Sequence, residues 1–206
     1  MSQYVKYAAH SGIQLMNSAV VLFMRHGLCQ SNVEWPIPDY SDEKDGLTAV
    51  GVEQAKLTAD WLRAHFPSER WIVVTSALTR ARQTGEVVNE ILGGILHEPD
   101  ARLNEFPGES VESYDSLDGR LRAFRDAVPG KCSRSDERVL VVTHGHVLEY
   151  LLIQAVRLGR PAIAERSELD VVTRGVPTHA NCGVSAFSGP GLQELVMWNR
   201  HAHLSK

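Results

Sequence analysis

Three consecutive residues, Arg25, His26 and Gly27, have properties suited to chemistry and follow directly on an apolar run. The planar guanidinium of Arg25 offers a fork of donors that matches phosphate oxygens. The imidazole of His26 can act near neutral pH as a nucleophile, a base or a metal ligand. Gly27 lets the backbone turn tightly or approach a ligand closely. A buried strand does not end in these residues by default, so they predict a binding or catalytic site.

Two further apolar runs end in residues of the same kind. Ser76 follows the run 71–75 and leads to Arg80, and His144-Gly145 follows the run 138–143. In open α/β sheets, ligands bind beyond the carboxyl ends of the strands. Two arginines and two histidines from distant parts of the sequence are therefore expected to meet in one pocket, which suits an anion of about phosphate size.

The elements that must position these residues alternate between strand and helix patterns. Apolar runs predict strands at 19–24, 71–75, 95–97 and 138–143, and two antiparallel strands near 182–187 and 195–198. Apolar residues at helical spacing predict four helices, over 48–66, around 81–91, over 114–128 and over 147–158. Thr48 is predicted to cap the first of these helices, and Gly93 is predicted to end the second. The alternation predicts a three-layer α/β/α fold, with a mostly parallel sheet and helices on both faces.

The domain organisation follows from the same pass along the chain. No repeat, low-complexity tract or linker interrupts the pattern, so residues 1–206 are predicted to form one domain. Residues 1–18 are weakly patterned and are expected to be a peripheral extension. Residues 33–46 are rich in Pro, Asp and Tyr, which predicts a surface loop beside the phosphate-binding candidates.

Composition limits the classes of partner. The chain is 43% hydrophobic and 22% charged, as expected of a soluble globular protein. A net charge of −4 without a long Lys/Arg run argues against nucleic acid and membrane surfaces as partners. No apolar stretch reaches the roughly 18 residues of a membrane-spanning helix. Three scattered cysteines, Cys29, Cys132 and Cys182, favour free thiols and a reducing compartment, so a cytoplasmic location is expected.

Four motifs in the expected order resemble those of the histidine phosphatase superfamily, which includes the cofactor-dependent phosphoglycerate mutases. The motifs are Arg25-His26-Gly27 with Asn32 five residues on, Leu47-Thr48-x-x-Gly51-x-x-Gln54-Ala55, Ser76-x-Leu78-x-Arg80-Ala81-x-Gln83-Thr84, and Thr143-His144-Gly145. The segments 103–105 and 199–204 are looser matches. The resemblance spans about residues 19–204 and implies a phosphoglycerate mutase-like fold.

The resemblance also implies a role for each matching residue in a phosphatase that needs no metal and no cofactor. His26 would accept the phosphoryl group and form a phosphohistidine. The residues that would surround the phosphate are Arg25, Arg80 and His144, with Asn32, Gly27 and Gly145. Two arginines can offset the charge of a phosphate dianion, and a histidine with a pKa of about 6.5 is largely neutral at cytosolic pH.

A general acid is required because an alkoxide is a poor leaving group. The resemblance implies that Glu105 protonates the leaving oxygen and then activates water. Glu109 and Glu112 lie close enough in sequence to compete for this role. The family commonly has an acidic residue and then Ser or Thr after Arg-His-Gly, whereas Leu28 and Cys29 stand here. A thiol is a poorer donor than a hydroxyl, so one phosphate or substrate contact is weakened.

The sequence therefore predicts a phosphomonoester hydrolase acting on a small phosphorylated metabolite. The alternatives are a phosphoglycerate mutase or sugar-bisphosphate phosphatase of the same family, and a non-catalytic phosphoester-binding module. The pairs His144/His146 and His201/His203 also raise a metal-dependent hydrolase, but no Cys, Asp or Glu set completes a ligand count. The sequence does not identify the substrate, which segments 33–46 and 98–115 are expected to select. The oligomeric state also stays open, with a homodimer as one possibility.

Overall fold

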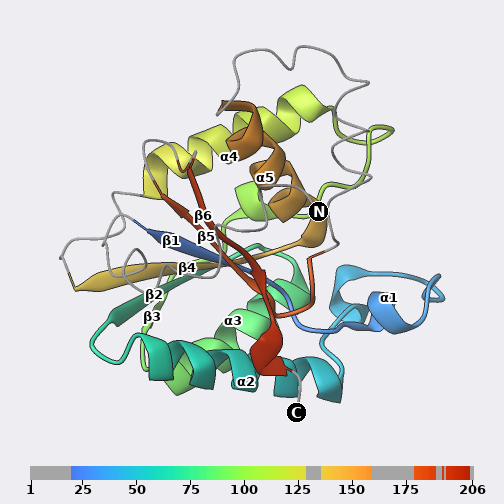
Figure 1. Cartoon of the computed structure of the whole chain (residues 1–206). Helices are drawn as coiled ribbons and strands as arrows, with labels where there is room; N and C mark the ends of the chain where they lie inside the picture. Colours follow the sequence, from blue (N-terminus) through green and yellow to red (C-terminus); the bar gives the residue numbers. More distant parts are fainter. Residues whose placement is uncertain (1–19, 129–135, 159–178, 189–191, 193, 205–206) are drawn as a thin grey trace.

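A computed structural model describes residues 20–128, 136–158, 179–188, 192 and 194–204. Within them the chain forms a six-stranded sheet in the order β3-β2-β4-β1-β5-β6 (Figure 1). The strands are β1 (Val21–Arg25), β2 (Arg70–Thr75), β3 (Ile95–Leu96), β4 (Glu137–Thr143), β5 (Val184–Ser188) and β6 (Glu194–Arg200). The first four pair in parallel, and β5 and β6 add an antiparallel edge beside β1.

Helices cover both faces of the sheet (Figure 1). On one face lie α2 (Ala49–His65) and α3 (Thr79–Leu92), and on the other α4 (Tyr114–Ala127) and α5 (Gly145–Leu158). Side chains of β1 alternate between them, since Phe23 packs in the core of α4 and α5 while Leu22 and Met24 pack in the core of α2. This two-sided burial explains the unbroken apolar run of β1 and confirms the predicted three-layer α/β/α fold with a mostly parallel sheet.

Most predicted elements agree with the structure to within a few residues. Thr48 caps α2, because its hydroxyl accepts a hydrogen bond from the backbone N–H of Gly51 at 3.0 Å. Gly93 ends α3 in the left-handed conformation, with φ of 63°. Short helical turns, α1 (Gln30–Val33), η3 (Asp42–Lys44) and η4 (Ala101–Leu103), lie within or next to segments predicted as loops. Residues 1–18, predicted as a peripheral extension, lie outside the described residues.

The strand register brings the candidate residues to one edge of the sheet. Arg25 of β1 is level with Thr143 of β4, and Thr75 of β2 is level with Val142. Just beyond these ends, the backbone N–H of His26 donates to the carbonyl of Thr143 at 2.9 Å. The residues that follow β1, β2 and β4, namely His26, Ser76 and His144, therefore lie side by side, as expected for the carboxyl edge of a parallel sheet.

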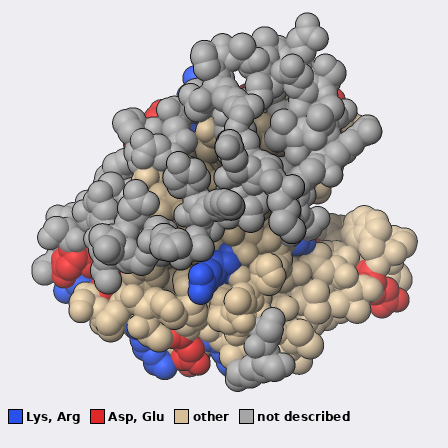
Figure 2. Space-filling model, in the orientation of Figure 1, with Lys and Arg blue, Asp and Glu red and all other residues tan. Residues whose placement is uncertain are grey.

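Two further observations concern the described helices and surface. No described helix is both long and apolar enough to cross a membrane. In Figure 2, acidic and basic residues are interspersed on the described part of the visible face.

Candidate active site

The structure brings His26, Arg80 and His144 together beyond the carboxyl ends of the strands. Nε of Arg80 lies 3.3 Å from Nε2 of His26, and the rings of His26 and His144 are 5.1 Å apart. All three side chains are buried. Arg25 reaches the same place, because a Cβ added to Gly145 would lie 3.5 Å from Cζ of its guanidinium. The predicted convergence of two histidines and two arginines is therefore present in the fold.

The hydrogen bonds of His26 determine which ring nitrogen carries the proton. Nδ1 lies 2.8 Å from the carbonyl oxygen of Gly27, and a carbonyl can only accept, so Nδ1 carries the proton. The lone pair is then on Nε2, which accepts a hydrogen bond from Nε of Arg80 at 3.3 Å. Burial, followed by the charges of Arg80 and Arg25, lowers the pKa of His26 from 6.5 to about 3. The ring is therefore neutral at physiological pH, with a nucleophilic nitrogen beside a guanidinium.

Gly27 shapes the backbone that carries His26. A Cβ at Gly27 would lie 2.5 Å from the carbonyl oxygen of Gly51, so only glycine permits this approach to the start of α2. Its N–H donates to the hydroxyl of Thr84 at 3.0 Å and is thus already engaged. Leu28 is also held by its backbone, because its N–H donates to Gln54 and its carbonyl accepts from Thr48, both at 2.9 Å. In this structure Gly27 positions His26 and presents no unused N–H to a phosphate.

Asp45 is a site residue that the sequence did not reveal. Its carboxylate accepts from Nη1 of Arg80 at 2.9 Å, and from the backbone N–H and the hydroxyl of Ser31 at 2.9 Å each. Asp45 is only 1% exposed, which corrects the prediction that the whole segment 33–46 is surface loop. Burial acts to raise its pKa, but the bonds from Ser31 and the charge of Arg80 outweigh burial and lower that pKa. An ionised Asp45 therefore fixes Arg80 with its Nε toward His26.

His144 and Arg25 present polar atoms that no described residue satisfies. Nε2 of His144 lies 2.7 Å from the hydroxyl of Ser76, which in turn donates to the side-chain oxygen of Asn104 at 3.0 Å. Burial, followed by the charges of His26, Arg80 and Arg25, lowers the pKa of His144 well below 6.5. Among the described residues, buried Nδ1 of His144 and Nε of Arg25 have no hydrogen-bond partner. A bound anion is one way to satisfy the N–H of Arg25, whereas Nδ1 of the neutral His144 ring can donate to an anion only after it takes up a proton.

Asn32 and Asn181 together hold the loop behind His26. The side-chain N–H₂ group of Asn181 donates to the backbone carbonyl of His26 at 3.0 Å and to the side-chain oxygen of Asn32 at 3.1 Å. The sequence did not reveal Asn181, because it lies 155 residues from His26 in a segment without a recognisable motif. Asn32 is therefore joined to the nucleophile's backbone, and its predicted contact with phosphate stays a prediction.

Glu105, the predicted acid, lies at the edge of this group. Its carboxylate accepts from the backbone N–H of Phe106 at 2.9 Å and lies 3.6 Å from Nδ1 of His146. The charge of Glu105 also acts on Arg25, where it opposes the lowering of the arginine's pKa by burial. Glu112 is paired with Arg120 at 2.7 Å, and this bond lowers the pKa of Glu112, which disfavours it as an acid. The choice between Glu105 and Glu109 stays a prediction.

The histidine pairs that suggested a metal site, His144/His146 and His201/His203, contact protein groups in the structure. His144 bonds to Ser76, whereas His146 pairs with Glu105. Nε2 of His203 bonds to the hydroxyl of Thr58 at 2.9 Å. In the described part of the chain, no group of three or more His, Cys, Asp or Glu side chains is placed to hold a metal ion.

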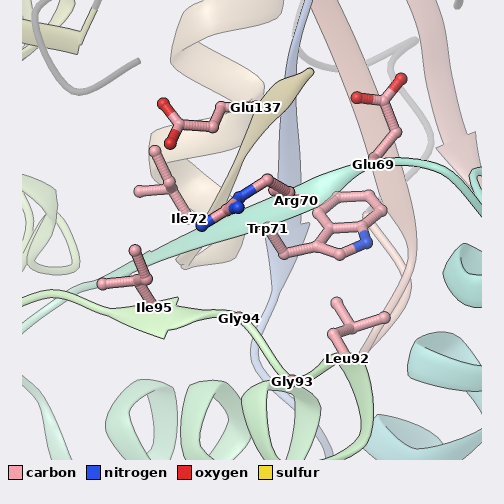
Figure 3. Close-up of a pocket in the computed structure, with 9 residues that line it drawn as sticks. All are labelled: Glu69, Arg70, Trp71, Ile72, Leu92, Gly93, Gly94, Ile95 and Glu137. Atoms are coloured by element: carbon pink, nitrogen blue, oxygen red, sulfur yellow. The ribbon is translucent and has the colours of Figure 1, made fainter. Parts of the chain in front are cut away.

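A separate pocket lies at the opposite end of β2 and β4, where these strands begin (Figure 3). It is lined by Glu69, Arg70, Trp71, Ile72, Leu92, Gly93, Gly94, Ile95 and Glu137. None of the predicted site residues lines it, so it has no part in the site around His26.

The low pKa of His26 leads to a prediction about stability. Between its folded pKa of about 3 and its ordinary value of 6.5, the unfolded chain binds a proton that the folded chain does not. The free energy of unfolding must therefore fall as the pH is lowered through this range. In His26→Asn, the fall between pH 7 and pH 5 should be smaller than in the wild type by roughly 2 kcal/mol.

Urea unfolding at pH 5, 6, 7 and 8 measures this difference. His65→Asn is the control, because His65 is exposed. Equal pH dependence in the wild type and His26→Asn would show that His26 is not held neutral by the fold.

Comparisons with known proteins found similar sequences and similar folds. A family model described as "Histidine phosphatase superfamily (branch 1)" matches residues 21–109 and 104–171. The "Uncharacterized phosphatase PhoE" of Bacillus subtilis is 30% identical over 158 residues, which cover 65% of this chain and 76% of the relative. The mitochondrial serine/threonine-protein phosphatase PGAM5 of Rattus norvegicus is 28% identical over 152 residues, 66% of this chain, and the chain spans 50% of that protein's length.

Among solved structures, the mycobacterial glucosyl-3-phosphoglycerate phosphatase Rv2419c, in complex with VO₃, has the same fold. The TM-score is 0.64 at 19% identity, over 88% of this chain and 99% of that one. The family model matches more than half of the chain and includes His26, Arg80 and His144. The chain belongs to branch 1 of the histidine phosphatase superfamily.

Proposed function

We propose that this protein hydrolyses phosphomonoesters of small metabolites through a phosphohistidine on Nε2 of His26, without a metal ion. One observation carries the proposal: a buried imidazole is kept neutral, and its lone pair on Nε2 accepts from Nε of Arg80 at 3.3 Å, a bond that Arg80 would exchange for one to the phosphate before Nε2 attacks. A nucleophile of this kind needs no prior deprotonation.

The proposed reaction has two steps. First, Nε2 of His26 attacks phosphorus, the bond from phosphorus to the ester oxygen breaks, and Glu105 as a carboxylic acid protonates the leaving alcohol. Second, water attacks the phosphohistidine, Glu105 as a carboxylate takes a proton from that water, and the P–N bond breaks. Phosphate leaves, and His26 and Glu105 return to their starting states.

Electrostatic stabilisation is the task of the surrounding groups. The guanidiniums of Arg80 and Arg25 would contact the equatorial oxygens, on which negative charge is spread during transfer, and the ring of His144 would join them with Nδ1 protonated in the presence of the phosphate. Asp45 holds Arg80 before the substrate arrives, so this charge is preorganised. The backbone N–H groups in the first turn of α5, which begins at Gly145, add the positive end of a helix dipole.

The names of relatives support hydrolysis of a phosphate ester, and a structural neighbour's title supports a small one, whereas PGAM5 is named for protein substrates. PhoE is named a phosphatase, and the structural neighbour's title names a sugar-containing phosphate ester. The buried free thiols of Cys29 and Cys182 fit the cytoplasmic location that we propose for the reaction.

The experiment that tests this function is a phosphate-release assay with the purified protein. An aryl phosphate and a panel of phosphorylated metabolites are supplied, with and without a chelator. We expect turnover that persists in chelator. Absence of turnover on every ester contradicts the proposal, and complete loss in chelator contradicts the metal-free mechanism.

Glu105→Gln should slow hydrolysis according to the leaving group. For an alkyl phosphate, whose alkoxide needs a proton, we expect kcat to fall by roughly 10²–10³-fold. For p-nitrophenyl phosphate, whose phenolate leaves unaided, phosphohistidine formation should be much less affected, as measured by single-turnover kinetics. Glu109→Gln serves as the matched control. If Glu105→Gln slows both esters equally, or if Glu109→Gln slows only the alkyl phosphate, Glu105 is not the general acid.

A further inference from the structure

Two exposed aromatic rings lie next to the site and are not used in the proposed mechanism. Trp35 is 67% exposed and Tyr40 is 46% exposed, and their ring centroids are 5.5 Å apart in an edge-to-face arrangement. Val33, 64% exposed, is on the same segment. In Figure 1 this segment, which follows α1, stands out from the body of the protein. Trp71, by contrast, is packed in the core with 4% exposure.

Hydrogen bonds connect this aromatic pair to the nucleophile. The hydroxyl of Tyr40 donates to Oδ2 of Asp45 at 3.4 Å. The same oxygen accepts from Nη1 of Arg80 at 2.9 Å, and Nε of Arg80 lies 3.3 Å from Nε2 of His26. The hydroxyl of Tyr40 therefore lies beside Asp45, which holds Arg80, and the ring of Trp35 lies next to Tyr40 on the outer side of this pair.

The segment that carries the rings is tied down at its base. The backbone N–H of Gln30 donates to the carbonyl of Gly46 at 3.1 Å, and both Ser31 donors reach Asp45 at 2.9 Å. Within the segment, Nζ of Lys44 donates to the carbonyl of Asp39 at 3.0 Å. These bonds hold Trp35 and Tyr40 as a preformed surface, which reduces the entropy lost when a ligand binds.

The charges on the segment point to an alcohol without further negative groups. Asp42 caps α3 by accepting from the N–H of Thr79, and Asp45 is paired with Arg80. Glu34, Asp39 and Glu43 are exposed, whereas Lys44 is the one cation between residues 33 and 46. A second phosphate or a carboxylate on the substrate would approach this excess of negative charge.

Building on the function proposed above, we propose that Trp35 and Tyr40 form a leaving-group subsite and that preferred substrates are monophosphates of uncharged alcohols that carry an aromatic ring. Exposed indole and phenol rings gain contact area when a further ring packs against them at low entropic cost. The link from Tyr40 through Asp45 to Arg80 favours a substrate over a second copy of the chain as the occupant.

Matched alkyl esters test the subsite, because their leaving groups have similar chemistry. We expect a kcat/KM at least about tenfold higher for 2-phenylethyl phosphate than for ethyl phosphate, and lower for 3-carboxypropyl phosphate than for either. Trp35→Ala should lower kcat/KM for 2-phenylethyl phosphate about tenfold and leave kcat/KM for ethyl phosphate within about twofold of the wild type. Trp35→Phe should retain most of the preference for the aromatic ester. Ile95→Ala is the control, because Ile95 is an exposed apolar side chain at the pocket of Figure 3, and it should leave kcat/KM for both esters unchanged.

The outcomes separate this subsite from the proposed function. Turnover of ethyl phosphate without an aromatic preference overturns the subsite and leaves the phosphatase intact. If no ester is hydrolysed, the phosphatase proposal fails, and calorimetry with 3-phenylpropylphosphonate and propylphosphonate still tests the subsite. Equal affinities of the wild type for these two phosphonates overturn it. A dimer that dissociates in Trp35→Ala, with an unchanged ester preference, assigns the surface to self-association and overturns it as well.

Discussion

His26→Asn is expected to lower kcat for phosphomonoester hydrolysis by roughly 10⁴-fold or more, because it removes the atom that forms the covalent intermediate. Asparagine fits the buried site and can still donate to the carbonyl that Nδ1 now contacts. The ring also carries the nitrogen that contacts Arg80, and asparagine supplies no nucleophile in its place. A steady-state assay with an aryl phosphate, run at high enzyme concentration, measures the loss.

A covalent label distinguishes loss of the nucleophile from loss of the fold. Brief incubation of the wild type with a ³²P-labelled ester, followed by quenching in alkali, should trap acid-labile phosphate on a peptide that contains His26. The control His65→Asn, at an exposed histidine of α2, should label like the wild type. Substantial turnover by His26→Asn, or labelling of another residue, would contradict the mechanism.

Arg80→Met should impair both activity and stability, for separate reasons. Activity should fall by roughly 10²–10³-fold, because a charge aimed at the transferring phosphoryl group is lost. The free energy of unfolding should fall by about 3–5 kcal/mol, because the buried carboxylate of Asp45 loses its ionic partner. Chemical denaturation and kcat/KM for the same ester measure the two effects.

A second variant separates these effects. In Arg80→Met with Asp45→Asn, the buried negative charge is also removed, so much of the stability should return while the activity stays low. Arg138→Met is the matched control, since Arg138 is a buried arginine paired with Glu69 at 2.8 Å away from the site. It should lower stability and leave kcat/KM unchanged. A fully stable Arg80→Met, or recovery of activity in the double variant, would contradict this account of the pair.

The fold was largely predictable from local sequence patterns. The apolar runs of β1, β2 and β4 are buried on both faces, and the helices show an apolar stripe, so each element carries its own signal. Gly93 ends α3 and Thr48 caps α2 through contacts with residues close in sequence, so both could be predicted from the sequence alone. The edge strands β5 and β6 were also recognisable, although β6 extends to Arg200, beyond the predicted end at 198.

The site was predictable only in part. His26, Arg80 and His144 follow strands, so their meeting could be inferred from the topology alone. Asp45 and Asn181 could not be found in this way, because their functions depend on tertiary contacts with residues far away in sequence. Asp45 lies in a segment whose Pro, Asp and Tyr content is typical of exposed loops, although it is 1% exposed. The one feature of the sequence that could have pointed to Asp45 as a site residue is its position two residues before the Leu47-Thr48 motif.

The close backbone contact between Gly27 and Gly51 has a consequence for how substrate preference can change. The main chain at residues 27 and 28 is fixed by Thr84, Gln54 and Thr48, so its path does not depend on the side chain at position 28. That side chain adjoins the nucleophile in sequence but carries none of the bonds that hold it. We therefore expect substitutions at position 28 to leave the backbone of His26 in place, so that saturation mutagenesis there tests whether this side chain influences substrate preference.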